Sequence, residues 1–285
     1  MRDGAEIAGP YTASYQGQPG AYSEQAALRI CGRDAMLLPC TTLAETFRAV
    51  SDGQAASAVI PIENTLAGAV PGALSLLLAS GFVVHGETSE WIDHVIAGPS
   101  GAALERVREV LSHPVALAQC ERFFRSHPDI LAVSVFDTAG AVEMVMRGAD
   151  ATRVALASRA AARLYGASIL AEHVQDHEAN YTRFVHVAPG PRRAIPAGSS
   201  RIMLAVRLAH QRGSLAAALH LLNTLGLNLT RIDSSPVPGC PFEYEFIIEG
   251  TTEGAAEAAA AIQTLEGDRR FRVLGCIQAA QINQK

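Results

Sequence analysis

Short apolar runs of strand length alternate with helix-like segments from residue 15 to residue 188. Apolar runs of about four to eight residues between turn residues predict strands, and apolar residues at 3.6-residue spacing predict helices. The pattern predicts strands at 56–62, 82–85, 91–97, 131–136, 154–157, 169–174 and 184–188, and helices at 24–30, from 43 onward, and at 70–79, 104–111, 116–124 and 159–165. Because alternating strands and helices pack as layers, the pattern indicates an α/β domain.

A segment rich in Pro, Gly and Ser follows at residues 189–200, and this composition is typical of an interdomain linker. Beyond it the predicted elements are strand, helix, strand, strand, helix and strand, at 201–208, 213–225, 227–234, 242–249, 255–265 and 271–278. That order, βαββαβ, is the ferredoxin-like motif. A chain of 285 residues is also long enough for about two domains. The polar lead of the chain is expected to be disordered.

The composition argues against several classes of function. A net charge of -5 without a basic stripe argues against nucleic acid as a partner. No apolar run reaches the ~18 residues of a membrane span, and the first residues lack a signal-peptide pattern, so a cytoplasmic protein without a membrane partner is expected. The five cysteines are far apart, which predicts neither a disulfide framework nor a zinc site.

The nine histidines do not form a metal-binding pattern. His173 and His177 are four apart, but they lie in H-V-Q-D-H and not in the H-E-x-x-H of zinc enzymes. No third ligand is evident, so no metal is expected. His94 is a more interesting candidate for a site residue, with a histidine satisfied within the core as the alternative.

Polar side chains gather at the ends of several predicted strands. Asn180-Tyr181-Thr182-Arg183 comes directly before the strand at 184–188, and this cluster of amide, hydroxyl and guanidinium groups is suited to binding an anion. The alternative is a solvated Arg183 beside an ordinary strand threonine. Glu63 and Asn64 follow the strand at 56–62, where ligands bind in open α/β sheets, or they form a polar turn that caps the next helix.

Two helix starts could supply backbone N–H groups to a ligand. Ser23 is a suitable N-cap for the first helix, and Gly17 and Gly20 let the preceding loop approach a carboxylate, although such a loop is more often a turn. Thr138 opens the helix after the strand at 131–136. Thr42-Leu43-Ala44-Glu45 matches the capping box of a further helix.

Taken together, these motifs resemble the prephenate dehydratase family over residues 14–285. The matching residues are Gly17 to Ser23, Pro61-Ile62-Glu63-Asn64 with Gly68, Ser112-His113-Pro114, Ala118-Gln119-Cys120, Thr138-Ala139, and Asn180 with Thr182-Arg183-Phe184. Each motif alone is weak, but their order, followed by a βαββαβ tail, is a specific signal.

The resemblance implies a monofunctional lyase that converts prephenate to phenylpyruvate in phenylalanine biosynthesis, without a cofactor. It implies a two-lobed, periplasmic-binding-protein-like catalytic domain at 11–189, with the second lobe at about 90–168 and the site between the lobes. A linker at 190–200 and an ACT regulatory domain at 201–285 follow. A homodimer or homotetramer with phenylalanine as allosteric effector is expected. Two alternatives stay open: an arogenate or cyclohexadienyl dehydratase, and a non-catalytic amino-acid-binding regulator.

The same resemblance assigns roles to residues. Thr182 is the family's catalytic threonine by position, and a hydrogen bond from its hydroxyl to the departing oxygen would strengthen as charge develops. Glu63 would be an acid only if burial raised its pKa. The full predicted catalytic set is Thr182, Glu63 and Asn64, and the predicted substrate-binding set is Arg183, Phe184, Asn180, Gly20, Ala21, Ser23, Thr138 and Ala139.

The predicted phenylalanine site lies in the βαββαβ tail. Gly213-Ser214-Leu215-Ala216 stands where the family has Gly-Ala-Leu-Ala, and Asp233-Ser234-Ser235-Pro236 stands where it has Glu-Ser-Arg-Pro. Ser235 therefore replaces a cation. The predicted effector-binding residues are Gly213, Ser214, Leu215, Ala216, Asn228, Leu229, Asp233 and Ser234.

Overall fold

The computed structural model describes residues 11–191, 195, 197–237, 239–240 and 242–278. The predicted disorder of the polar lead therefore concerns a segment that lies mostly outside these residues. The chain divides into two compact units: the first holds the residues up to Val70 and Ser89–Phe184, and the second holds Pro71–Thr88 and the chain from Val185 onward. The domain boundaries predicted from the sequence stay predictions. Within the described residues, no helix is long and apolar enough to cross a membrane.

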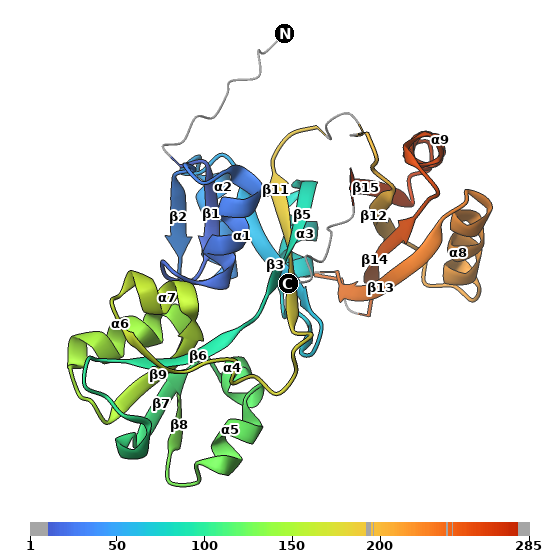
Figure 1. Ribbon diagram of the computed structural model, residues 1–285. Helices are drawn as coiled ribbons and strands as arrows, with labels where there is room; N and C mark the ends of the chain where they lie inside the picture. Colours follow the sequence, from blue (N-terminus) through green and yellow to red (C-terminus); the bar gives the residue numbers. More distant parts are fainter. Residues whose placement is uncertain (1–10, 192–194, 196, 238, 241, 279–285) are drawn as a thin grey trace. The chain divides into compact units, whose positions relative to one another are not determined.

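The first sheet has the strand order β2-β1-β3-β11-β5 (Figure 1). The short strand β4 pairs with β3. Its strands are β1 (Ala13–Gln16), β2 (Leu37–Cys40), β3 (Ala58–Asn64), β4 (Gly68–Ala69), β5 (Val83–Trp91) and β11 (Tyr181–Ala188). The helices α1 (Tyr22–Cys31) and α2 (Leu43–Ser51) belong to the same part of the first unit. Tyr15, Val59 and Phe184 pack with the alanines of α1 in one core cluster, which connects β1, β3 and β11 with this helix.

The second sheet has the order β10-β6-β9-β7-β8 and lies in the first unit. Its strands are β6 (His94–Gly98), β7 (Glu109–Ser112), β8 (Leu131–Ser134), β9 (Arg153–Ser158) and β10 (Ser168–Ala171). Neighbouring residues of β7 enter different cores: Leu111 packs with α6 (Thr138–Gly148) and α7 (Arg159–Leu164), while Val110 packs with α4 (Pro114–Ala118) and α5 (Glu121–Ser126). Both faces of this sheet are thus covered, as expected when helices connect parallel strands.

Two of the helices predicted from the sequence are not found as predicted. The predicted helix at 104–111 is wrong: a 3₁₀ turn (η1, Leu104–Arg106) precedes the strand β7, which pairs in parallel with β8 and β9. Adjacent residues buried on opposite faces of a sheet resemble one apolar helix face in a short window. The predicted helix at 116–124 is two helices, α4 and α5, which are interrupted at Gln119 and Cys120.

The structure also tests the predicted N-caps and strand boundaries. The predicted Ser23 N-cap is wrong, because α1 begins at Tyr22 and Ala21 is its N-cap. The Thr42 capping box is confirmed, since the Thr42 hydroxyl accepts the Glu45 N–H at 3.1 Å. The strand predicted at 82–85 runs on to Trp91, and the strand predicted from Trp91 starts only at His94.

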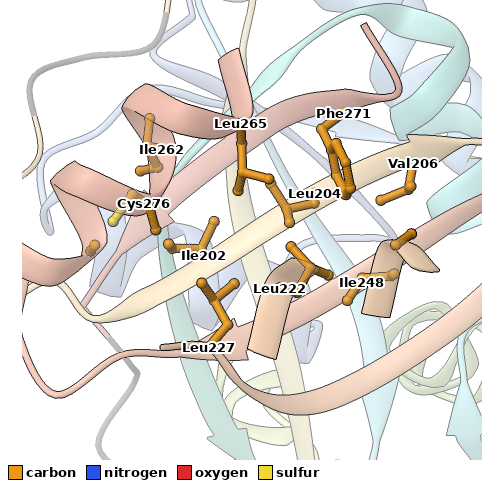
Figure 2. Packing of buried hydrophobic residues seen from close by; sticks show 13 residues of the cluster. Ile202, Leu204, Val206, Leu222, Leu227, Ile248, Ile262, Leu265, Phe271 and Cys276 are labelled. Carbon is orange, nitrogen blue, oxygen red and sulfur yellow. The ribbon is translucent and has the colours of Figure 1, made fainter. Parts of the chain in front are cut away.

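The second unit contains the predicted βαββαβ order. It comprises β12 (Arg201–Arg207), α8 (Ser214–Thr224), β13 (Asn228–Pro236), β14 (Tyr244–Thr251), α9 (Ala255–Glu266) and β15 (Phe271–Ile277), together with α3 (Ala73–Ser80). The antiparallel sheet has the order β13-β14-β12-β15, and the ferredoxin-like prediction is confirmed. Figure 2 shows Ile202, Leu204 and Val206 of β12 against Leu222 of α8 and Leu265 of α9.

A buried group of charges joins this sheet to the start of β5 within the second unit. Glu249 is 0% exposed, and its carboxylate lies 3.4 Å from the guanidinium of Arg201 and 3.6 Å from that of Arg231. Arg201 also lies 3.5 Å from Glu87 of β5. Nearby, the Ser75 hydroxyl of α3 is 2.8 Å from that of Ser235, so the serine at the family's arginine position contacts a helix. These contacts tie β12, β13 and β14 to α3 and β5.

We expect Glu249→Ala to destabilise the second unit by about 3 kcal/mol, because it removes the buried carboxylate that Arg201 and Arg231 share. Each arginine then keeps one carboxylate partner, Glu87 or Asp233. Glu243→Ala is the matched control: its pair with Arg207 is exposed on both sides, so little change is expected. Urea unfolding followed by circular dichroism measures both. Equal unfolding midpoints for the two variants would contradict the prediction.

Candidate active site

The side-chain amide of Asn64 is fixed in orientation at the end of β3. Its Oδ1 accepts the backbone N–H groups of Leu66 at 2.9 Å and Ala67 at 2.8 Å. Because backbone N–H groups only donate, the opposite atom is Nδ2, which lies 2.8 Å from Asn180 Oδ1 and 3.0 Å from Thr182 Oγ1. Asn64 is 8% exposed, so the turn after β3 holds an amide donor against the predicted catalytic threonine.

Thr182 and Arg183 lie within β11, since this strand begins at Tyr181 and not at Phe184 as predicted. The Thr182 oxygen accepts the Asn64 N–H, which leaves its own hydrogen for another acceptor. Among the described residues, no protein acceptor for that hydrogen is found. Phe184, predicted as a substrate contact, is 2% exposed and belongs to the core, so its predicted contact with substrate stays a prediction.

Glu63 and Arg183 form an ion pair with 3.7 Å between Oε2 and Nη1. The arginine side chain is only 13% exposed, while that of Glu63 is 42% exposed. The burial that an acid role for Glu63 would require is therefore absent. The arrangement presents a largely buried guanidinium next to Thr182, with a more exposed carboxylate beside it.

Gln119 connects the second sheet's helices to this cluster. Its Oε1 accepts Asn180 Nδ2 at 2.9 Å, and its Nε2 lies 3.4 Å from Asn64 Oδ1. Asn180 is fully buried. Gln119 was recognised in the Ala118-Gln119-Cys120 motif without a role. The sequence predicts one helix over 116–124, so the break that places Gln119 between α4 and α5 is a finding of the structure.

Several residues predicted to bind substrate at the two helix starts are buried or contact other groups of the protein. The Gly20 N–H donates to Glu24 Oε2 at 2.6 Å, and a Cβ at Gly20 would lie 2.6 Å from Ala161 Cα. Ala21 is buried, and Ser23 lies inside α1. Thr138 opens α6 with the buried Ala139, where the Asp137 carboxylate accepts the Gly140 N–H at 2.8 Å. Substrate binding by Gly20, Ala21, Ser23, Thr138 and Ala139 stays a prediction.

His94 borders the cluster from the start of β6. It is 2% exposed, its Nε2 lies 3.3 Å from Gln119 Oε1, and its Nδ1 lies 3.2 Å from the Tyr22 hydroxyl. Burial lowers the pKa of His94 to about 4, although Gln119 and Asp93 oppose this shift. Burial also raises the pKa of Tyr22 well above its usual range. His94 is therefore an uncharged imidazole at neutral pH, not a base poised near 7.

The predicted effector residues lie in the second unit and fall into two groups. Ser214 and Leu215 line a cavity of about 160 Å³ at the start of α8, beside Tyr244. Gly213 is the N-cap of α8 with φ 87°, and Ala216 follows within the helix. The remaining residues, Asn228, Leu229, Asp233 and Ser234, lie on β13, and the Asp233 carboxylate pairs with Arg231. Their role in binding phenylalanine stays a prediction.

The fold and the site define an α/β protein with two sheets, a donor-rich cluster at a strand end and a ferredoxin-like unit. A family model described as prephenate dehydratase matches residues 13–192. The bifunctional N-acyl-homoserine lactone acylase/prephenate dehydratase of Komagataeibacter europaeus is 36% identical over 275 residues, which covers 95% of this chain and 97% of the relative. The chloroplastic arogenate dehydratase/prephenate dehydratase 2 of Arabidopsis thaliana is 35% identical, covering 92% of this chain and 71% of the relative.

The solved structures agree with the family model. Prephenate dehydratase from Arthrobacter aurescens, solved in complex with L-Phe, is 25% identical with a TM-score of 0.82, and the match covers 96% of this chain and 91% of that one. The chain belongs to the prephenate dehydratase family. Its fold prediction, a two-lobed α/β protein, is confirmed by these structures.

The uncharged state of His94 predicts a pH dependence of stability. A histidine in the unfolded chain binds a proton below about 6.5, whereas folded His94 does so only at about 4. The free energy of unfolding should therefore fall as pH falls from 6.5 to 4, by up to about 1.4 kcal/mol per pH unit for one proton. His94→Gln should show a shallower fall in urea titrations over this window. Parallel curves for the two proteins would contradict the assignment.

Proposed function

We propose that the protein is a lyase that converts prephenate to phenylpyruvate, with loss of carbon dioxide and of the ring hydroxyl as water. Family membership supports this reaction. One observation of the site carries the proposal: Thr182 Oγ1 accepts a hydrogen bond from Asn64 Nδ2 at 3.0 Å, so the hydroxyl hydrogen of Thr182 can be donated elsewhere. That hydrogen is available to the departing oxygen of the substrate. Aromatisation of the ring drives the reaction, so the protein needs only to bind, orient and stabilise developing charge.

The Asn64 donor strengthens Thr182 as a donor. Hydrogen bonds in a chain polarise one another, so a hydroxyl that accepts an N–H gives its own hydrogen more readily. Because Asn64 is fixed by two backbone N–H groups, this dipole is already oriented before the substrate binds. Preorganised donors aimed at developing negative charge are among the largest contributions to catalysis.

Arg183 anchors a substrate carboxylate. A guanidinium offers two parallel N–H groups to a carboxylate and keeps its charge when it is largely buried. Glu63, on the more exposed side of the pair, balances this charge in the free protein, and the substrate carboxylate competes with it. Asn180 and Phe184 are predicted substrate contacts, and this stays a prediction. In the structure, Asn180 accepts from Asn64, and Phe184 belongs to the core.

The test is an assay with prephenate at neutral pH that follows phenylpyruvate. Wild type should turn prephenate over, and Thr182→Val should lower kcat by about two orders of magnitude with a much smaller change in KM, because the lost bond acts mainly in the transition state. Thr182→Ser, which keeps the hydroxyl, is the matched control and should retain most activity. An unchanged kcat in Thr182→Val would remove the hydroxyl from the mechanism.

Arogenate and an N-acyl-homoserine lactone should be tested as substrates beside prephenate, because relatives of the chain are named for them. The Arabidopsis relative is named for arogenate as well as prephenate, and faster turnover of arogenate would make this the alternative dehydratase. The Komagataeibacter relative, matched along nearly all of its length, is named as an acylase for N-acyl-homoserine lactones. Amide hydrolysis needs a nucleophile beside a base, but the uncharged His94 contacts Gln119 and Tyr22 instead of Thr182. If the protein turns over none of these three substrates, the non-catalytic amino-acid-binding regulator is the remaining alternative.

Phenylalanine should inhibit the reaction through the second unit. We place its site at the start of α8 and on β13, between two copies of the chain in a homodimer or homotetramer. The Arthrobacter relative was solved with L-Phe, and Ser214 and Leu215 border a cavity here. Isothermal titration should show binding of phenylalanine, and Gly213→Val, which blocks the left-handed N-cap position, should abolish it while leaving basal turnover. Absence of heat with the wild type would contradict this regulation.

A further inference from the structure

The orientation of every amide in the cluster follows from two backbone groups. Leu66 and Ala67 fix Asn64 Oδ1, so the Gln119 atom 3.4 Å from that oxygen is the donor Nε2. Asn180 Oδ1 accepts from Asn64, so its Nδ2 faces Gln119. Both contacts assign the same orientation to Gln119 and place Oε1 toward the second sheet. No choice of side-chain flip is left open in this chain of contacts.

The same logic determines the proton on His94. Its Nε2 lies 3.3 Å from Gln119 Oε1, which is only an acceptor, so Nε2 carries the hydrogen. In the neutral ring, Nδ1 is then an acceptor. The Tyr22 hydroxyl donates to the Asp93 carbonyl oxygen at 2.7 Å and lies 3.2 Å from Nδ1. The acceptor Oε1 of Gln119 thus selects the tautomer of His94.

The imidazole is held rigidly. Its ring meets the Tyr22 ring edge-on with centroids 5.7 Å apart, and its backbone N–H donates to Gln175 Oε1 at 2.9 Å. Gln119, by contrast, lies in the break between α4 and α5, outside any regular element. A long side chain there has several rotamers, and His94 supplies a donor that restricts it to one.

We propose that His94, as the Nε2–H tautomer, is a positioning residue for the dehydration: it holds Gln119 in the rotamer in which Gln119 contacts Asn180 and Asn64 beside Thr182. The proposal rests on the function proposed above. His94 touches neither substrate nor Thr182, and it transfers no proton, because the amide of Gln119 separates it from the hydroxyl. Its effect is geometric, and a misplacement of about 1 Å at a distance from the reacting atoms can cost up to 10²-fold in rate.

Two substitutions separate the ring nitrogens. His94→Gln places an amide N–H near the position of Nε2, whereas His94→Asn offers a polar group only near Nδ1. We expect His94→Asn to lower kcat by about tenfold or more with KM within about threefold, and His94→Gln to recover most of kcat. A structural role alone would reduce both variants in parallel with their unfolding midpoints. Equal kcat losses, or wild-type kcat in both variants, would overturn the proposal.

The dependence on Gln119 is tested by a double-mutant cycle. If His94 acts through Gln119, His94→Asn should cost little further in a Gln119→Leu background. Additive losses would show that His94 acts by another route and would contradict the proposal.

The tautomer is tested apart from activity. ¹⁵N NMR of the histidine rings should show His94 with a protonated Nε2 and an unprotonated Nδ1 at pH 7, and Gln119→Leu, which removes the acceptor, should weaken this preference. A protonated Nδ1 would overturn the assignment whatever the activity is. A wild type that does not dehydrate prephenate would instead contradict the proposed function, and with it the positioning role, while the tautomer measurement would stand by itself.

Discussion

The site depends on two backbone N–H groups in the turn between β3 and β4. Leu66 and Ala67 hold Asn64 Oδ1, and this fixes which side of the amide faces β11. A backbone donor cannot reverse its role, whereas a side-chain amide can flip, so the turn acts as the reference for all polar contacts beyond it. The flips of the Asn180 and Gln119 amides follow from that of Asn64, while His94 Nε2 meets Gln119 from the other side. The Thr182 oxygen accepts directly from Asn64.

Burial explains why the side-chain amides of this network each have one orientation. Asn180 is 0% exposed and His94 is 2% exposed, so each polar group must find a partner inside the protein. Flipping one amide of this network would bring two acceptors or two donors together, so its side chains favour one arrangement. The amide that donates to Thr182 is therefore oriented in the free protein.

The ion pairs of the two units differ in how deeply the carboxylate is buried. In the first unit, Arg183 is largely buried beside a more exposed Glu63, and this arrangement agrees with the proposal that the guanidinium exchanges its partner for a substrate carboxylate. In the second unit, Glu249 is completely buried against Arg201 and Arg231, where an exchange with solvent would cost much more. The first pair suits binding, and the second suits a fixed junction between the βαββαβ sheet and β5.

The sequence by itself predicted the alternation of strands and helices and the βαββαβ order, because period and turn residues are local properties. The motif residues Asn64, Asn180, Thr182 and Arg183 came from the resemblance to the family. It did not separate β7 from a helix, since Val110 and Leu111 are buried on opposite faces only once β8 and β9 pair with that strand. Nor did it give Gln119 and His94 their roles, because their partners lie 25 or more residues away. Only the tertiary structure decided these contacts: a hydrogen bond between distant residues depends on how the sheets bring them together, and that placement has no local signature.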